Sequence, residues 1–280
     1  MATVDLTLEE RPGLRNRLYN FVAILGDWSS FSGRTLGWCF WRRPDRGTLA
    51  QSIYFVGVKT APVVIVTGLF IGMVLAIQAY ESFRMFGMAT RQGELINASM
   101  VRELGPVLVA TMLAGRVGSA MAAELATMRI TEQVDALACL GANPLHHLVV
   151  PRFLACVTII PLLTILANLA GVLGGAYISI NVFSIDPHHY WSHSRGSVNN
   201  WDVISGLIKP IFFGAVIALV SCHRGLTSRP GAQGVGRAAT EAFVASFVVI
   251  LVLDFFLSLF FTQLGGLLGW GKLPRFTPSL

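Results

Sequence analysis

Residues 153–185, FLACVTIIPLLTILANLAGVLGGAYISINVFSI, decide the fold class, because they form a long apolar stretch without a charged side chain. A helix needs about 20 apolar residues to cross the hydrocarbon core of a bilayer. This stretch is longer, so it must tilt, kink or extend past the core. The whole chain agrees: of its 280 residues, 54% are hydrophobic and only 13% are charged. Soluble proteins carry about 25% charged residues, so we predict an integral membrane protein.

Four further apolar segments bring the prediction to five transmembrane helices. They run from Lys59 to Glu81 and over Leu104–Leu125, Val203–Cys222 and Phe243–Leu268. The connecting loops are too short to hold a hydrophobic core of their own. Small residues in the spans, such as Gly171, Gly174 and Gly175, predict close helix packing in lipid. The predicted fold class is therefore an all-α integral membrane protein.

The N-terminal segment, residues 1–49, differs from the spans because it is amphipathic. From Leu14 to Trp41, apolar residues recur at helical spacing, and Trp28 and Trp38 suit the depth of lipid headgroups. We interpret this stretch as an interfacial helix lying on the membrane; the alternative is a soluble helix packed on a partner. Its early acidic residues predict that it is not a cleavable signal peptide. Residues 50–270 then form the membrane domain, and residues 271–280 form a tail.

The distribution of lysine and arginine predicts the orientation. Segments 1–50, 127–152 and 223–241 hold twelve of these residues, against five in segments 81–101, 183–202 and the tail from 270. Basic residues collect on the cytoplasmic side of membrane proteins. We therefore expect the N-terminus in the cytoplasm and the C-terminus on the opposite side of the membrane.

Nucleotide and nucleic-acid binding are not favoured. The nearest string to a Walker A loop is Gly57-Val58-Lys59-Thr60, in which valine stands where the motif needs glycine. No basic run alternates with aromatic residues as a platform for nucleic acid would require. We expect no nucleic-acid partner, and no nucleotide bound by this chain.

Catalytic and metal sites are not favoured either. His188, His189 and His193 gather with Asp186 in one outer loop and could hold a cation, but such residues are common in solvated loops, which is the interpretation we prefer. Four scattered cysteines without a C-x-x-C pair do not predict a disulfide framework or a zinc site. We expect no catalytic residue, no metal and no cofactor.

Three charged residues lie inside apolar spans: Arg116, Glu124 and Asp254. Such residues are costly in lipid and are functional candidates by default. Arg116 and Glu124 are about 12 Å apart along a helix, so we expect each to pair with another element. A structural ion pair and a role in transport remain equally open, and a proton relay through these groups is a sharper alternative.

A short charged segment follows the second span. Residues 128–137, MRITEQVDAL, predict a helix capped by Thr131 and stopped by Gly141 and the Asn143-Pro144 pair. A rigid helix between two spans on the cytoplasmic face is well placed to receive force from a soluble partner. The alternative is a solvated connector.

Several motifs together resemble the MlaE (YrbE) permeases of lipid-moving ABC transporters. They are Thr67–Leu75 (TGLFIGMVL), Arg102–Pro106 (RELGP), Ala114–Ala120 (AGRVGSA), Ala123-Glu124, Met128–Gln133 (MRITEQ), Pro151–Phe153 (PRF) and Leu253–Phe255 (LDF). The similarity covers roughly residues 50–262, in order and with similar spacing. It implies a homodimer of five-span subunits, each with an N-terminal interfacial helix.

The resemblance also implies partners. Two cytoplasmic ATPase subunits would dock on the dimer and bind the ATP and magnesium, and a periplasmic MCE-domain lipid-binding protein would cap it. Within residues 129–141, the coupling helix would present Arg129, Glu132, Gln133 and Asp135 to the ATPase. The loop Gly225–Thr240 would lie near it on the same face.

The family's lipid cavity opens outward at the dimer axis, between the end of the first span and the start of the second. The matching positions are Leu75, Tyr80, Phe83, Phe86 and Leu104, with Arg102 and Glu103 as polar neighbours. Glu81 and Ser82 depart from the apolar residues expected there. The expected function is a permease that moves phospholipid between the inner membrane and the periplasmic carrier. The alternatives are an ion-coupled secondary transporter of a hydrophobic substrate and a non-transporting scaffold.

Overall fold

The structure, a computed structural model, describes residues 14–41, 45–85, 87–88 and 91–267. Within these residues every regular element is a helix, and five helical segments are long and apolar enough to cross a membrane. They are Arg46–Met85, Gln92–Ile130, Leu145–Val182, Asn200–Leu226 and Ala232–Leu267. The prediction of five spans in an all-α fold is confirmed, although each helical segment is longer than the stretch predicted for it.

The first span consists of two helices, α2 (Arg46–Val56) and α3 (Ala61–Met85), joined by a turn over residues 57–60. Pro62 explains the break, because it has no N–H to donate to the carbonyl of Val58. Proline is tolerated in the first turn of a helix, where that N–H has no partner in any case. The break therefore places Lys59 in an exposed turn between α2 and α3.

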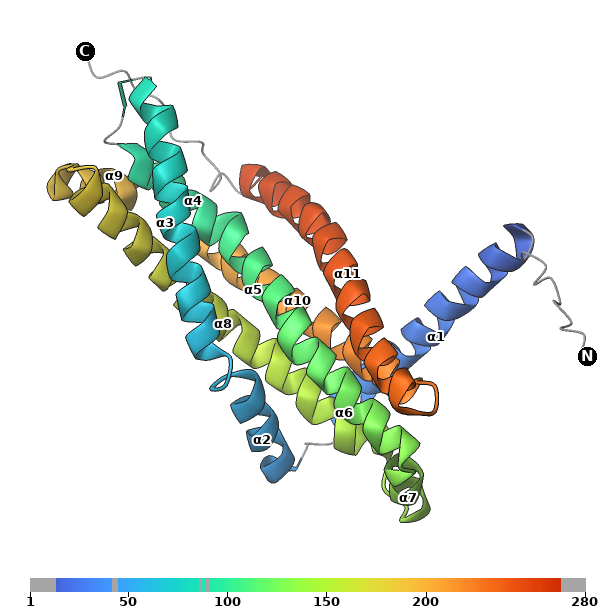
Figure 1. The fold of residues 1–280 in the computed structure, drawn as a ribbon. Helices are drawn as coiled ribbons and strands as arrows, with labels where there is room; N and C mark the ends of the chain where they lie inside the picture. Colours follow the sequence, from blue (N-terminus) through green and yellow to red (C-terminus); the bar gives the residue numbers. More distant parts are fainter. Residues whose placement is uncertain (1–13, 42–44, 86, 89–90, 268–280) are drawn as a thin grey trace, which may run out of the picture.

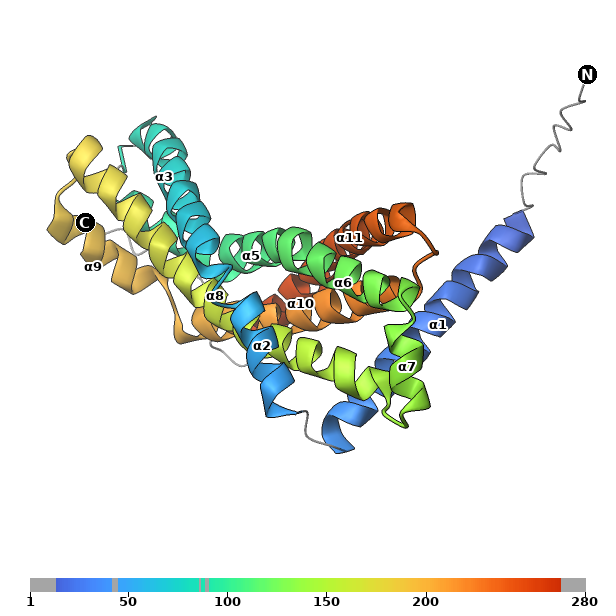
Figure 2. The same cartoon turned by 60° about the horizontal axis from the view of Figure 1, so that its bottom comes forward.

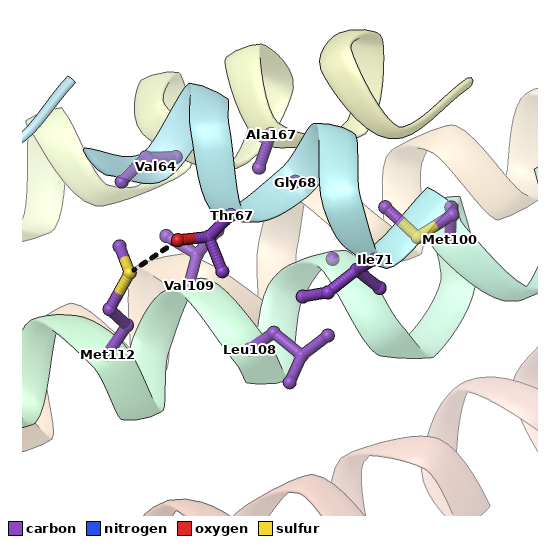
Figure 3. Close-up of a pocket in the computed structure, with 10 residues that line it drawn as sticks. Val64, Thr67, Gly68, Ile71, Met100, Leu108, Val109, Met112 and Ala167 are labelled. Atoms are coloured by element: carbon purple, nitrogen blue, oxygen red, sulfur yellow. Dashed lines mark hydrogen bonds between the residues drawn. The ribbon is translucent and has the colours of Figure 1, made fainter. Parts of the chain in front are cut away.

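α3 packs backbone to backbone against α8 (Val150–Tyr177), the main helix of the third span. A Cβ atom added at Gly72 would lie 1.9 Å from the carbonyl oxygen of Gly171, and one at Gly68 would lie 2.6 Å from that of Ala167. Figure 3 shows Gly68 of α3 facing Ala167 of α8. Lipid tails are as apolar as the side chains, so hydrophobicity does not drive helices together in a membrane. Close backbone contact favours their association through van der Waals packing. The predicted tight packing at Gly171 is confirmed.

The second span is interrupted twice by wider, π-helical turns. It runs through α4 (Gln92–Ser99), η2 (Met100–Leu104), α5 (Gly105–Leu113), η3 (Ala114–Gly118) and α6 (Ser119–Ile130). The first of these turns, η2, follows from Pro106, which has no N–H to give to the carbonyl of Arg102. The N–H of the preceding residue, Gly105, bonds five residues back, to the carbonyl of Met100. Turns of this kind are frequent at functional sites. Here they carry the charged residues Arg102, Glu103 and Arg116.

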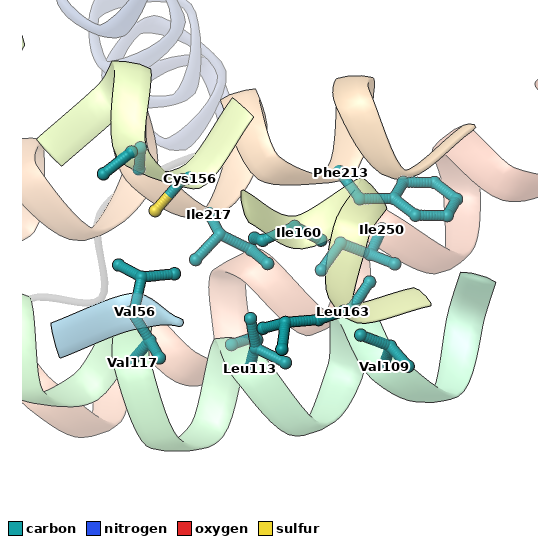
Figure 4. Close-up of a cluster of buried hydrophobic side chains, with 14 of the residues drawn as sticks. Val56, Val109, Leu113, Val117, Cys156, Ile160, Leu163, Phe213, Ile217 and Ile250 are labelled. Carbon is teal, nitrogen blue, oxygen red and sulfur yellow. The ribbon is translucent and has the colours of Figure 1, made fainter. Parts of the chain in front are cut away.

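The core of the bundle lies where α8 packs against α5 and α10 (Asn200–Leu226), and α10 packs against α6. Figure 4 shows its buried side chains, among them Leu113, Val117, Ile160, Leu163, Phe213, Ile217 and Ile250. Ile250 belongs to α11 (Ala232–Leu267), the last helix, which packs on α10 and α6. Most of the other apolar side chains of α11 are exposed, as expected for a helix that faces lipid or a second protein.

The two ends of the bundle carry different short helices. α9 (Pro187–Ser197) packs against α4 at one end, and α7 (Gln133–Cys139) follows α6 at the other (Figures 1 and 2). α1 (Leu14–Trp41) contacts α10 and η4 (Leu145–Val149) near the α7 end and projects away from the bundle. Its contact with α10 includes Asp27, which lies 3.0 Å from the ring of His223. The interfacial position of α1 stays a prediction.

Candidate functional site

A buried lysine organises the polar contacts inside the bundle. Lys209 of α10 is only 2% exposed, and its Nζ lies 2.7 Å from Glu103 and 3.2 Å from Asp254. It also donates to the hydroxyl of Ser258 at 2.7 Å and to the carbonyl of Arg102 at 3.2 Å. That carbonyl is the one that Pro106 leaves without its helical donor. The lysine therefore links the second, fourth and fifth spans through a charge and a backbone contact.

A second ion pair lies next to the first. Arg102 bonds to Asp202 at 2.8 Å, and Asp202 also accepts the N–H of Asn199 in the capping box that starts α10. Asp202 is 7% exposed on its side chain, whereas Arg102 and Glu103 are 45% and 48% exposed. Buried partners thus fix the two charges while part of each stays open to a ligand. Partly exposed charges that are held in place can bind a polar group, and the attraction is stronger where the dielectric constant is low.

Three of the predicted cavity residues gather on the neighbouring surface. Leu75 and Phe83 of α3 and Leu104 of η2 pack against one cluster of buried side chains that includes Ile96 and Met100. The cluster joins the end of the first span to the start of the second, and the lipid cavity expected there stays a prediction. Leu104 follows Glu103 on the same turn but packs toward α3, whereas Glu103 pairs with Lys209 of α10 and Ser258 of α11.

The other predicted cavity residues lie differently. Tyr80 stacks on Phe183 with ring centroids 3.8 Å apart, and it packs with the buried Tyr190 of α9. This contact ties α3 to the loop before α9 rather than to η2. Phe86 lies outside the described residues. Among the described residues, the side chains of Arg102 and Glu103 pair with α10 and α11 rather than with α3.

A narrow apolar crevice runs between α3 and the second span (Figure 3). Its lining includes Thr67 and Ile71 from α3 and Leu108 and Met112 from α5, and the Thr67 hydroxyl lies 3.5 Å from the Met112 sulfur. The crevice holds about 10 Å³, which is about the space of a single water. An acyl chain therefore fits between these helices only if they separate.

The segment proposed for coupling is a helix, but it begins later than predicted. The prediction that Thr131 caps it is wrong: the Thr131 hydroxyl donates to the carbonyl of Thr127 at 2.9 Å, so it ends α6. Glu132 then takes a left-handed conformation with φ of 60°, and α7 starts at Gln133. Threonine bonds readily to a carbonyl four residues back, an option that a search for caps overlooks.

α7 stays attached to α6 through an ion pair across this break. Arg129, in the last turn of α6, bonds to Asp135, in the first turn of α7. Glu132 and Gln133 remain exposed at the tip. The arrangement holds a short helix at a fixed angle to a membrane span, which a partner protein requires if it is to move that span. The role of these residues in coupling stays a prediction.

The three charges predicted inside the spans have different surroundings. Glu124 pairs with Arg152 of α8 at 3.0 Å, and Asp254 pairs with Lys209. The expectation that Glu124 pairs with another element is confirmed. Arg116 is exposed and makes no hydrogen bond or ion pair with the part of the chain that the structure describes. Its predicted pairing is not found there.

Sequence reasoning missed the partners of these charges. Lys209, Arg152, Asp202 and Ser258 were not proposed as site residues. Lys209 gave the clearest signal, because it is the single charge in the fourth predicted span, and a lysine inside a span needs an acidic partner. In the outer loop, Asp186 has a local structural role, because it caps α9 by accepting the backbone N–H of His188 at 2.8 Å.

Fold and site together define a multi-pass helical membrane protein whose spans are joined by buried ion pairs. Residues 49–260 match the MlaE permease family, and the chain belongs to that family. It is 42% identical over 216 residues to a probable ABC transporter permease of Synechocystis, a match that covers 77% of this chain and 82% of the relative.

Two further relatives carry more specific names. The chain is 36% identical to the intermembrane phospholipid transport system permease protein MlaE of Haemophilus influenzae, over 75% of this chain and 81% of that protein. It is 38% identical to the chloroplastic protein trigalactosyldiacylglycerol 1 of Arabidopsis thaliana, over 79% of this chain and 63% of that protein. These relatives and the family match make this chain an ABC transporter permease.

Proposed function

We propose that this chain is the permease subunit of a transporter that moves phospholipid between a bacterial inner membrane and a periplasmic carrier with an MCE domain. Membership in the MlaE permease family supports the permease role. The name of the Haemophilus influenzae relative supports the phospholipid. The assembly holds two copies of this chain and two cytoplasmic ATPase subunits, and these subunits bind the ATP and magnesium.

One observation carries the lipid proposal: the turn η2 holds two half-exposed charges on its α10 and α11 side and an apolar side chain on its α3 side. Arg102 has a planar guanidinium that can give paired hydrogen bonds to a phosphate, and it keeps Asp202 as its buried partner. Leu104, Leu75 and Phe83 offer the apolar surface on the α3 side. A phospholipid has the same arrangement, a charged headgroup joined to acyl chains. The surface between α3 and η2 is therefore the proposed lipid site.

The mechanism is mechanical. Closure of the ATPase dimer on ATP pushes α7, and the Arg129–Asp135 ion pair transmits the push to α6. α6 continues through the second span to η2, so the second span moves against α3. The lipid site narrows and expels its lipid toward the carrier. This scheme requires α7 and the N-terminus in the cytoplasm and the α9 end of the bundle in the periplasm.

A substitution in the apolar surface tests the proposed lipid site. Leu104→Gln keeps the size of the side chain but places an amide among acyl chains, where it lacks a hydrogen-bond partner. We expect the purified variant to lose most of the phospholipid that copurifies with the wild-type protein, measured by lipid extraction and mass spectrometry.

The matched control is Leu162→Gln on α8, where the leucine is exposed on the outside of the bundle. It should keep the wild-type amount of bound lipid, since it lies outside the proposed site. Equal lipid content in the Leu104→Gln variant and the control would place the lipid elsewhere.

A further inference from the structure

A second polar site lies at the opposite end of the bundle from the proposed lipid site. The loop between α10 and α11 and the first turns of α11 enclose a cavity of about 260 Å³. It is lined by Arg224, Thr227, Ser228, Arg229, Gly234, Arg237, Ala238 and Glu241. Gly225 packs on the backbone of Ala122 in α6, so the cavity lies at the α7 end. None of these residues takes part in the contacts described above.

The cavity has an excess of positive charge. Its one acidic residue, Glu241, bonds to Arg237 at 2.7 Å and to Arg224 at 3.4 Å. Arg229, the third arginine, makes no hydrogen bond or ion pair with the described residues. The lining therefore holds three guanidinium groups and one carboxylate, and its net charge is positive.

Further hydrogen-bond donors face the same space. The Ser228 hydroxyl is buried and has no partner among the described residues. α11 begins at Ala232, and the N-terminus of a helix carries a partial positive charge, although the N–H groups of Gly234 and Val235 already bond to the carbonyl of Gly231. Gly234 keeps the loop against this terminus, because a Cβ atom there would lie 2.0 Å from the carbonyl oxygen of Arg229. These donors are typical of an anion site. Phosphate is an anion that both arginine guanidinium groups and helix N-termini bind.

An exposed apolar surface continues from this cavity along α11. Val244, Val248 and Leu251 follow Arg237 and Glu241 at spacings of three and four residues, so they share one side of the helix. Each of the three is about half exposed. A ligand with its phosphate in the cavity thus meets apolar side chains directly beside it, in the hydrocarbon region. An acidic protein segment would gain nothing from that surface.

We propose that this cavity binds the headgroup of an anionic phospholipid from the membrane leaflet at the α7 end, with its acyl chains along α11. The net positive lining favours an anionic headgroup over a zwitterionic one, whose amine the arginines would repel. This site is separate from the proposed lipid site at η2, and it needs neither an ATPase nor transport to be occupied.

Titration of the purified full-length protein with short-chain phosphatidylglycerol, followed by isothermal calorimetry, tests the proposal. We expect saturable binding that Arg229→Gln weakens about tenfold or more, the loss typical of one charge-assisted hydrogen bond. Arg229→Lys should keep part of the affinity, since it keeps the charge. Arg195→Gln, the same change in exposed α9 at the other end, should leave the affinity unchanged.

Two further measurements distinguish a phospholipid headgroup from free inorganic phosphate as the ligand. Inorganic phosphate should bind more weakly than the lipid, and Val248→Ser should weaken lipid binding but not phosphate binding. Equal affinity for both probes would assign the cavity to free phosphate. Unchanged lipid affinity in the Arg229→Gln variant would overturn the site, and it would point to a protein contact if the same variant releases the ATPase from the whole complex.

Discussion

At the scale of single residues, Lys209 is a buried charge that needs several partners at once. Its charge is buried and is balanced by Glu103 and Asp254 from two other spans. Burial of an ion costs several kcal/mol, and the cost is recovered only when the partners and the remaining hydrogen bonds are in place. Ser258 and the carbonyl of Arg102 provide those bonds. The lysine therefore depends on all three spans keeping their relative positions.

Removal of this charge should destabilise the bundle. Lys209→Met leaves two carboxylates facing each other without a cation, and we expect a loss of about 3 kcal/mol or more of stability. Thermal unfolding of the detergent-purified protein measures the loss. The triple variant Lys209→Met, Glu103→Gln, Asp254→Asn removes all three charges and should recover part of it.

The control is Lys59→Met, which changes an exposed lysine in the turn before α3. It should leave the unfolding temperature near the wild-type value. If Lys209→Met is no more harmful than this control, the buried ion pairs do not hold the spans together.

The ion pairs also bear on the alternative of an ion-coupled transporter. That alternative requires an acidic residue free to exchange protons at Glu124 or Asp254. Glu124 pairs with Arg152, and Asp254 pairs with Lys209, so the contacts of both residues agree with a structural role. Arg116 differs from these two residues, because it has no ion-pair partner among the described residues. A second copy of the chain or a lipid headgroup is left as its partner.

At the scale of elements, α7 is the clearest candidate for contact with a partner. It is a short helix whose exposed tip holds Glu132 and Gln133 and whose base is tied to α6 by the Arg129–Asp135 ion pair. An element that only connects two spans has no need of a fixed angle to one of them.

Charge reversal on this element tests the coupling role. Glu132→Lys with Asp135→Lys should release the ATPase in a pull-down from detergent extracts, because Glu132→Lys replaces an attraction to the partner with a repulsion and Asp135→Lys also breaks the Arg129 ion pair that ties α7 to α6. The permease should still elute as a folded dimer on size-exclusion chromatography. Retained ATPase binding would contradict the coupling role of α7.

Glu94→Lys in α4 is the matched control, since it reverses a charge at the other end of the second span. It should leave ATPase binding unchanged. Equal loss of the ATPase in both variants would indicate a general defect of the permease rather than a broken contact.

The sequence predicted elements better than contacts. The five spans follow from runs such as residues 153–185, because hydrocarbon requires apolar residues over a fixed length. The contact of Lys209 with Glu103 could not be predicted in this way, since pairing across more than a hundred residues depends on how the helices rotate in the bundle. The turn at η2 could have been predicted, because Pro106 removes a helical bond at a known position. The end of α6 at Thr131 could not be predicted, because the threonine hydroxyl can either cap a following helix or bond to the carbonyl of Thr127, and it does the latter.

At the scale of the whole molecule, much of the exposed surface is apolar. α3 and α11 both expose rows of large apolar side chains, such as Phe70 and Val74 on α3 and Phe255 and Phe256 on α11. Lipid covers such surfaces in a membrane, and a second copy of the chain would cover part of them in a dimer. The exposed Arg116 is better accommodated in a dimer than in bare lipid, where a charge is costly.

We propose that this permease works as a dimer with a separate ATPase and phospholipid. Native mass spectrometry of the complex, purified from its own membrane in mild detergent, tests it most directly. We predict a mass that fits two copies of this chain, two ATPase subunits and bound phospholipid. A bare oligomer without an ATPase, under conditions in which other ABC transporters stay intact, would contradict the account and favour an ion-coupled transporter.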